Sequence, residues 1–108
     1  SCVPASERAA LVALYNATNG SSWTNKTNWL SADENTWFGV TVTGCRVTNL
    51  FLTTNNLTGS IPTEIGDLPA LQTLQLENNL LAGSIPTSIG NLTNLTSLDL
   101  RGNQLSGA

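Results

Sequence analysis

The sequence predicts an α/β solenoid, in which strand-plus-turn units coil into a short parallel sheet behind a helical N-terminal cap. The first observation is a pattern that recurs every 24 residues, as in Leu50, Leu74 and Leu98, within the range of periods typical of solenoids. The second is a preceding segment that lacks this pattern and carries all three tryptophans of the chain. We therefore divide the 108 residues into a cap at 1–46 and repeats at 47–70, 71–94 and 95–108, the last one partial.

The first predicted element is a helix that begins near Ser6. We expect Ser6 to cap the helix and Glu7 to lie at the positive end of its dipole. Gly20, after Asn19, would supply the left-handed residue that ends the helix. Helical spacing predicts one apolar stripe, which consists of Ala10, Leu11, Leu14 and either Ala17 or Thr18.

Trp23, Trp29 and Trp37 follow in a polar stretch without sustained periodicity. The interior of the first repeat would otherwise face water, so we interpret the three rings as plugs of the cap. A carbohydrate-binding platform remains an alternative for Trp23 alone. The alternation between Phe38 and Val47 then predicts a short hairpin or edge strand that leads into the repeats.

Each repeat supplies inward leucines and one asparagine that we expect to be buried. The amide must satisfy backbone groups, because a buried amide without partners would cost about 1–3 kcal/mol. Alternate residues of each strand face outward, and a Gly-Ser-Ile-Pro run leads to the convex side. The inward set is Leu50, Leu52, Leu57, Leu74, Leu76, Leu81, Leu98, Leu100 and Leu105, with Asn55, Asn79 and Asn103, and with Ile65, Leu68, Ile89 and Leu92 on the convex side.

These residues resemble the plant-type extracellular leucine-rich repeat, whose pattern is LxxLxLxxNxLxGxIPxxLGxL. Residues 56–68 and 81–92 match it almost position for position, and Trp37 to Val40 with a closing Cys45 resembles the cap that precedes such repeats. The resemblance implies that the concave sheet binds a protein or peptide ligand. The candidate contacts on that face are Phe51, Gln75, Glu77, Asp99 and Arg101.

Cys2 and Cys45 are the only cysteines and lie at the two ends of the segment before the repeats. Their position suggests a disulfide, with two separate buried thiols as the alternative. The family cap commonly has a further cysteine two residues before the matching tryptophan, where Asn35 stands in this chain. This departure favours a direct pair between Cys2 and Cys45.

Composition excludes several classes of function. The net charge is −3 and the four basic residues are scattered, so we expect no nucleic-acid partner. No apolar run approaches the ~20 residues of a membrane helix. The chain has no histidine, which excludes Cys–His metal sites and His-dependent triads, and we predict no metal, cofactor or enzymatic activity. Glu77 and Asp99 could pair as hydrolytic carboxylates, but an ion pair between Glu77 and Arg101 is the simpler interpretation.

Six Asn-x-Ser/Thr sequences together with a disulfide favour a secreted glycoprotein, and we expect a processed chain. Asn19, Asn25 and Asn91 fall in expected loops and turns, which favours their occupancy by N-linked glycans. The acceptor residues are Asn16, Asn19, Asn25, Asn56, Asn91 and Asn94.

The last repeat leaves three interpretations open. Its leucines would be exposed to water on their C-terminal side, next to an unpaired strand edge. These leucines are Leu95, Leu98, Leu100 and Leu105. The chain could therefore be a fragment of a longer array, pair with another chain, or stack on copies of itself head-to-tail into a filament. Ice binding is a minor alternative suggested by columns of Thr and Asn, although the column that begins with Thr53 continues with charged residues.

Overall fold

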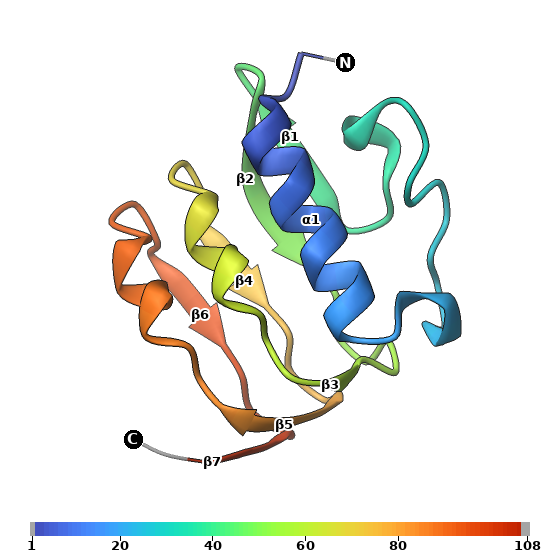
Figure 1. The fold of residues 1–108 in the computed structure, drawn as a ribbon, viewed down its shortest axis with the longest axis vertical. Coiled ribbons are helices and arrows are strands. Elements are labelled where there is room, and N and C mark those ends of the chain that lie inside the picture. Colours follow the sequence, from blue (N-terminus) through green and yellow to red (C-terminus); the bar gives the residue numbers. More distant parts are fainter. Residues whose placement is uncertain (1, 107–108) are drawn as a thin grey trace.

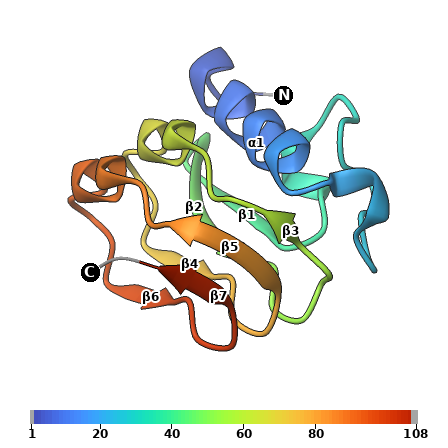
Figure 2. The ribbon, with the colours of Figure 1, turned by 60° about the horizontal axis from the view of Figure 1, so that its bottom comes forward.

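The computed structural model describes residues 2–106, which coil so that strands and short helices alternate along the chain (Figure 1). A four-stranded sheet has the order β1-β2-β4-β6, in which β1 is antiparallel to β2 and the other strands are parallel. The short helices of the two repeats, η3 and η4, stack beside α1 in a separate layer (Figure 2). The strands of this sheet are β1 (Val40–Thr43), β2 (Arg46–Phe51), β4 (Thr73–Gln75) and β6 (Ser97–Asp99). The helices are α1 (Ala5–Ala17), η1 (Gly20–Ser22), η2 (Glu34–Thr36), η3 (Thr63–Asp67) and η4 (Thr87–Asn91).

A second parallel sheet, absent from the sequence-based prediction, has the order β3-β5-β7. It is built from the residues that follow the asparagine of each repeat (Figure 2). Its strands are β3 (Thr58–Gly59), β5 (Leu80–Ser84) and β7 (Gln104–Ser106). Each coil therefore has three sides, formed by the first sheet, the helices and this second sheet.

The limits of α1 differ from the prediction at both ends. Pro4 occupies the N-cap position and its carbonyl accepts the first helical hydrogen bonds, so Ser6 lies inside the helix and does not cap it. The fixed φ of proline prepares this start without a side-chain cap. At the other end Asn19, with φ +56°, takes the left-handed conformation, which asparagine tolerates. Gly20 serves a different need, because a Cβ there would lie 2.1 Å from the Tyr15 ring.

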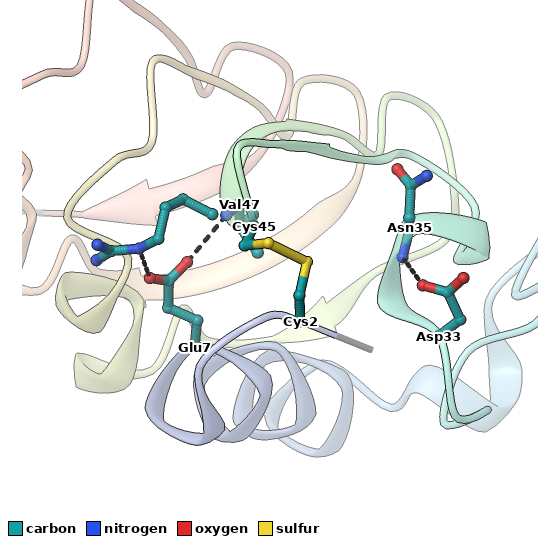
Figure 3. The surroundings of a disulfide bond; sticks show 7 residues. Cys2, Glu7, Asp33, Asn35, Cys45 and Val47 are labelled. Atoms are coloured by element: carbon teal, nitrogen blue, oxygen red, sulfur yellow. Dashed lines mark hydrogen bonds and ion pairs between the residues drawn. A yellow bond between two sulfur atoms is a disulfide. The ribbon is translucent and has the colours of Figure 1, made fainter.

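Glu7 ties α1 to the start of the repeats. Its side chain is buried, and Oε1 accepts a hydrogen bond from the Val47 backbone N–H at 2.9 Å. Arg46 donates its Nε to the other carboxylate oxygen (Figure 3). The carboxylate thus satisfies a buried backbone donor of β2 in addition to any effect on the helix dipole.

The three tryptophans plug the cap as predicted. They are buried, and the indole centroids of Trp23 and Trp29 lie 4.7 Å apart in an edge-to-face contact. Trp37 is the most enclosed, at 1% exposure, and lies 4.9 Å from Trp29. The Trp23 indole N–H donates to the Thr18 carbonyl at 3.1 Å. At 4% exposure, Trp23 offers no face to a carbohydrate, so the platform alternative is wrong.

Cys2 and Cys45 form the disulfide, with their Cα atoms 5.1 Å apart (Figure 3). The bond joins the residues before α1 to the turn between β1 and β2. At the position where the family cap commonly has a further cysteine, the Asn35 backbone N–H is held by the Asp33 side chain at 3.1 Å. This contact caps η2, and the predicted hairpin of β1 and β2 follows it.

The core is most complete in the first two repeats. The inward leucines of β2, β4 and the turns after them have no exposed surface, whereas Leu98 of β6 is 43% exposed. Within residues 2–106, no helix has the length and apolar content needed to cross a membrane.

A ladder of asparagine side chains runs along the coil. Oδ1 of Asn79 accepts from the backbone N–H groups of Asn55 at 2.8 Å and Leu57 at 3.1 Å. Asn103 repeats the arrangement one coil later, where its Oδ1 accepts from the Leu81 N–H at 3.0 Å. At the other end Asn55 pairs with the Asn25 backbone, accepting at 2.7 Å and donating at 2.9 Å. The cap loop thus takes the place of a preceding repeat.

Candidate functional site

The predicted ligand contacts lie in two rows across the four-stranded sheet. Phe51, Gln75 and Asp99 are register partners on β2, β4 and β6 and form the first row. The second row lies two residues beyond the first, just after the strands end, where Glu77 and Arg101 follow Thr53 in successive repeats. The structure therefore brings together all five candidate residues that the sequence pattern singled out.

Phe51 is the aromatic residue that this face presents to solvent. It is 40% exposed, whereas Gln75 beside it is half-buried. Thr48, earlier on the same strand, is buried because its hydroxyl lies against Thr41 and Thr43 of β1. On β2 the accessible part of the face therefore begins near Phe51, at the end of the strand.

The charged residues pair differently from the prediction. Arg101 binds Asp99, two residues earlier in the chain, through two side-chain bonds, from Nε to Oδ1 at 3.0 Å and from Nη2 to Oδ2 at 2.8 Å. Glu77 instead accepts a hydrogen bond from the Thr53 hydroxyl at 2.8 Å. The expected Glu77–Arg101 pair is therefore wrong, because the turn after β6 also brings the Arg101 N–H to Asp99 at 3.1 Å and favours the local contact.

The Arg101 contact lowers the pKa of Asp99 from 3.8 to about 2, chiefly through the side-chain hydrogen bond and then through the backbone hydrogen bond. We expect Arg101→Gln to return the Asp99 pKa toward 3.8, as measured by NMR titration of the carboxyl carbon. A lowered pKa in the folded state contributes stability above the unfolded pKa of about 3.9, and this contribution is lost as the pH falls through the folded pKa. The variant should therefore lack most of this contribution at neutral pH, and its stability should fall less than that of the wild type as the pH is lowered through this range. Lys26→Gln is the control, and an unchanged Asp99 pKa in Arg101→Gln would contradict the assignment.

Residues 2–106 contain no group of three or more His, Cys, Asp or Glu side chains placed to hold a metal ion. A second surface feature lies on α1, where an open depression of about 460 Å³ is lined largely by small apolar residues. This feature was not among the sequence-based predictions, which concerned only the buried stripe of the helix. Its lining residues are Ala5, Arg8, Ala9, Val12, Ala13 and Asn16.

The far edge of the four-stranded sheet is formed by β6, which pairs with β4. Leu98 is exposed there, while Leu95, Leu100 and Leu105 are half-buried. Head-to-tail assembly through this edge remains a prediction.

The family model described as Leucine rich repeat matches residues 45–105. The chain belongs to the leucine-rich repeat family. This match and the coil of repeats confirm the predicted α/β solenoid and the plant-type resemblance. No curated protein sequence matches the chain.

Solved structures of other leucine-rich repeat proteins superpose on nearly the whole chain. A plant ice-binding protein is 32% identical with a TM-score of 0.87, and the match covers 99% of this chain and 36% of that one. The ectodomain of the receptor kinase SOBIR1 from Arabidopsis thaliana is 30% identical with a TM-score of 0.74, over 97% of this chain and 58% of that one. The Arabidopsis thaliana GASSHO1/SCHENGEN3 ectodomain, solved with CASPARIAN STRIP INTEGRITY FACTOR 2, is 38% identical with a TM-score of 0.84, over 92% and 12%. The chain thus spans about a third of the ice-binding protein, about three-fifths of the SOBIR1 ectodomain and about an eighth of the GASSHO1/SCHENGEN3 ectodomain.

Proposed function

We propose that this chain is a non-enzymatic extracellular module that binds a protein or peptide ligand across the concave, four-stranded sheet. The observation that carries the proposal is Phe51, a large apolar side chain held 40% exposed on an otherwise polar strand surface. Aromatic residues in such positions are the usual anchors of protein interfaces. Structures similar to this chain include receptor ectodomains solved with peptide ligands, such as PEPR1 with AtPEP1 and HAESA with the IDA peptide hormone.

The surroundings of Phe51 suit an extended ligand. Gln75 lies beside it across the sheet, and Glu77 accepts the Thr53 hydroxyl through one carboxylate oxygen. An apolar side chain of the ligand would contact Phe51, while its backbone N–H groups would meet the amide and carboxylate oxygens.

The width of the sheet limits what this chain can bind by itself. Its three parallel strands, about 4.8 Å apart, span only about 10 Å across the rows. A standard stable interface uses about 20–30 residues on each side. The chain therefore provides a contact site for a short peptide or one part of a larger binding surface.

The extracellular location rests on two observations. The chain contains a disulfide, and such bonds persist in oxidising compartments. Two of the similar structures, those of SOBIR1 and GASSHO1/SCHENGEN3, are described as ectodomains of plant receptor kinases.

The proposal is tested by panning a random peptide library on the immobilised chain and measuring the affinity of the selected peptides. We expect Phe51→Ala to weaken binding by about tenfold or more, since loss of an aromatic anchor costs about 2 kcal/mol. Leu80→Ala is the matched control, because Leu80 is also an exposed apolar residue, 50% accessible, but lies on the second sheet. It should change the affinity about twofold or less. Failure to select any peptide, or equal effects of both variants, would argue against the concave face.

Ice binding is the second candidate, favoured by the similarity to the plant ice-binding protein. The second sheet supports it better than the concave face, because Ala82, Ser84 and Ser106 are small and exposed there. On the concave face Thr53 is followed by Glu77 and Arg101, which interrupt a uniform surface. Ice crystals of unchanged shape at high protein concentration would exclude this candidate and leave peptide binding unaffected.

Self-assembly through the β6 edge is checked on the same purified sample by light scattering. A mass that grows with concentration in the wild type, and that Leu98→Ser returns to one chain, is the result expected for head-to-tail stacking.

A further inference from the structure

Two of the six acceptor asparagines connect the cap to the first repeat. Asn19 donates its Nδ2 to the hydroxyl of Thr58, which is the third residue of the Asn56 acceptor sequence. Asn56 in turn donates its Nδ2 to the Ser22 carbonyl at 2.9 Å. A backbone bond from the Thr58 N–H to the Thr18 carbonyl, 3.2 Å long, closes the same junction. The two side chains therefore bridge the cap and the first repeat in both directions.

Asn94 makes a similar contact between repeats. Its Nδ2 donates to the carbonyl of Pro69 in the preceding repeat at 3.0 Å. In all three cases the engaged atom is the amide nitrogen, which is the atom to which an N-linked glycan attaches. A glycan there would replace one of the two amide hydrogens and place a sugar ring against the adjoining segment.

The other three acceptor asparagines leave this nitrogen without a hydrogen-bond partner among residues 2–106. Asn16 lies in the last turn of α1, and Asn91 is the last residue of η4, with both side chains exposed. Asn25 uses only its oxygen, which accepts from the Thr27 N–H at 3.0 Å and from the Thr27 hydroxyl at 2.6 Å. Its nitrogen is therefore available for modification.

We propose that N-linked glycans are attached at Asn16, Asn25 and Asn91, and that Asn19, Asn56 and Asn94 remain unmodified. The proposal rests on the extracellular location inferred above. Nδ2 forms a bond to C1 of an oligosaccharide carried on a lipid diphosphate, the bond from C1 to the phosphate oxygen breaks, and the diphosphate leaves with the electron pair. The amide loses one proton. In a chain glycosylated at Asn19, Asn56 or Asn94, the cap or a repeat would pack poorly on its neighbour. Such a chain would be retained in the cell before secretion.

This distribution leaves the candidate binding surface open. The end of α1, the cap loop and η4 all lie outside the four-stranded sheet (Figure 1). None of the six acceptor asparagines belongs to β2, β4 or β6. The glycans would therefore cover the helical side and the cap, where the Asn16 glycan would border the depression on α1.

The test is site-by-site mapping on the chain secreted from eukaryotic cells. Enzymatic release of the glycans in ¹⁸O-labelled water converts each occupied asparagine to a labelled aspartate, which is read by peptide mass spectrometry. We expect the label at Asn16, Asn25 and Asn91 only. Occupancy concentrated at Asn19, Asn56 or Asn94, or an absence of glycans from the secreted chain, would overturn the proposal.

Two variants provide a matched readout on the intact protein. Ser21→Ala and Thr93→Ala each remove the hydroxyl of one acceptor sequence, and both residues are exposed with no side-chain hydrogen bond among residues 2–106. Thr93→Ala should reduce the secreted mass by one glycan, whereas Ser21→Ala should leave it unchanged, and the reverse result would contradict the proposal. Peptide affinity measured on the same samples separates failure of this inference from failure of the proposed function.

Discussion

Asn79→Ala is expected to lower the free energy of unfolding by about 4 kcal/mol. Its side-chain oxygen accepts from two buried backbone N–H groups, and its nitrogen donates to the carbonyls of Leu52 and Leu76, both at 2.9 Å. An unsatisfied buried donor costs about 1–3 kcal/mol, and this substitution leaves two of them. The loss is a large share of the roughly 5–15 kcal/mol typical of a domain. Urea unfolding followed by circular dichroism measures it.

Asn103→Ala is the matched control for this prediction. Asn103 occupies the equivalent position one repeat later and donates to the Leu76 carbonyl at 2.9 Å, but it is half-buried and its Oδ1 accepts from one backbone N–H, that of Leu81. Water can replace part of its role, so we expect less than half of the loss seen at Asn79. Equal losses at the two positions would contradict the account in which buried, unsatisfied backbone donors set the cost.

Removing the disulfide in the double variant Cys2→Ser and Cys45→Ser should destabilise the fold by about 4 kcal/mol in the chain-entropy model. The cysteines are separated by 43 residues, so the cross-link restricts a long loop of the unfolded chain. Reduction of the wild type should produce the same shift in the unfolding midpoint, and a reductant should not affect the double variant.

The Glu7 contacts join the same two parts of the chain as the disulfide, the start of α1 and the start of β2. Glu7 joins α1 to Val47 close to the disulfide (Figure 3). These contacts act in the folded state, whereas the cross-link acts mainly on the unfolded chain. A wild type that loses less than about 1 kcal/mol on reduction would contradict the entropic account.

Local periodicity was enough to predict the coil and its interior. The 24-residue spacing places Leu50 beside Leu74, and both are fully buried as expected. The same spacing placed Asn55 and Asn79 in the ladder and Phe51 beside Gln75 on the outward face. These features depend on side-chain alternation within a strand and on the stacking of equal units, which a sequence displays directly.

The capping of the ladder by the Asn25 backbone could not be predicted in this way. Its contacts join residues 30 positions apart that share no repeat. The same holds for the pair of Asn19 and Thr58, 39 positions apart, which places an acceptor asparagine in a structural junction. Such partners depend on how the cap docks on the first repeat, and no period in the sequence encodes that docking.

The sequence by itself determined the solenoid, its buried leucines and asparagines, the tryptophan plug and the outward row that contains Phe51. Tertiary structure alone decided that Arg101 pairs with Asp99 rather than with Glu77, and which acceptor asparagines keep a free amide nitrogen. The physical reason is the sequence distance over which each interaction acts. Strand alternation and repeat stacking follow from neighbours along the chain, whereas the partner of each polar side chain depends on which segments meet in space.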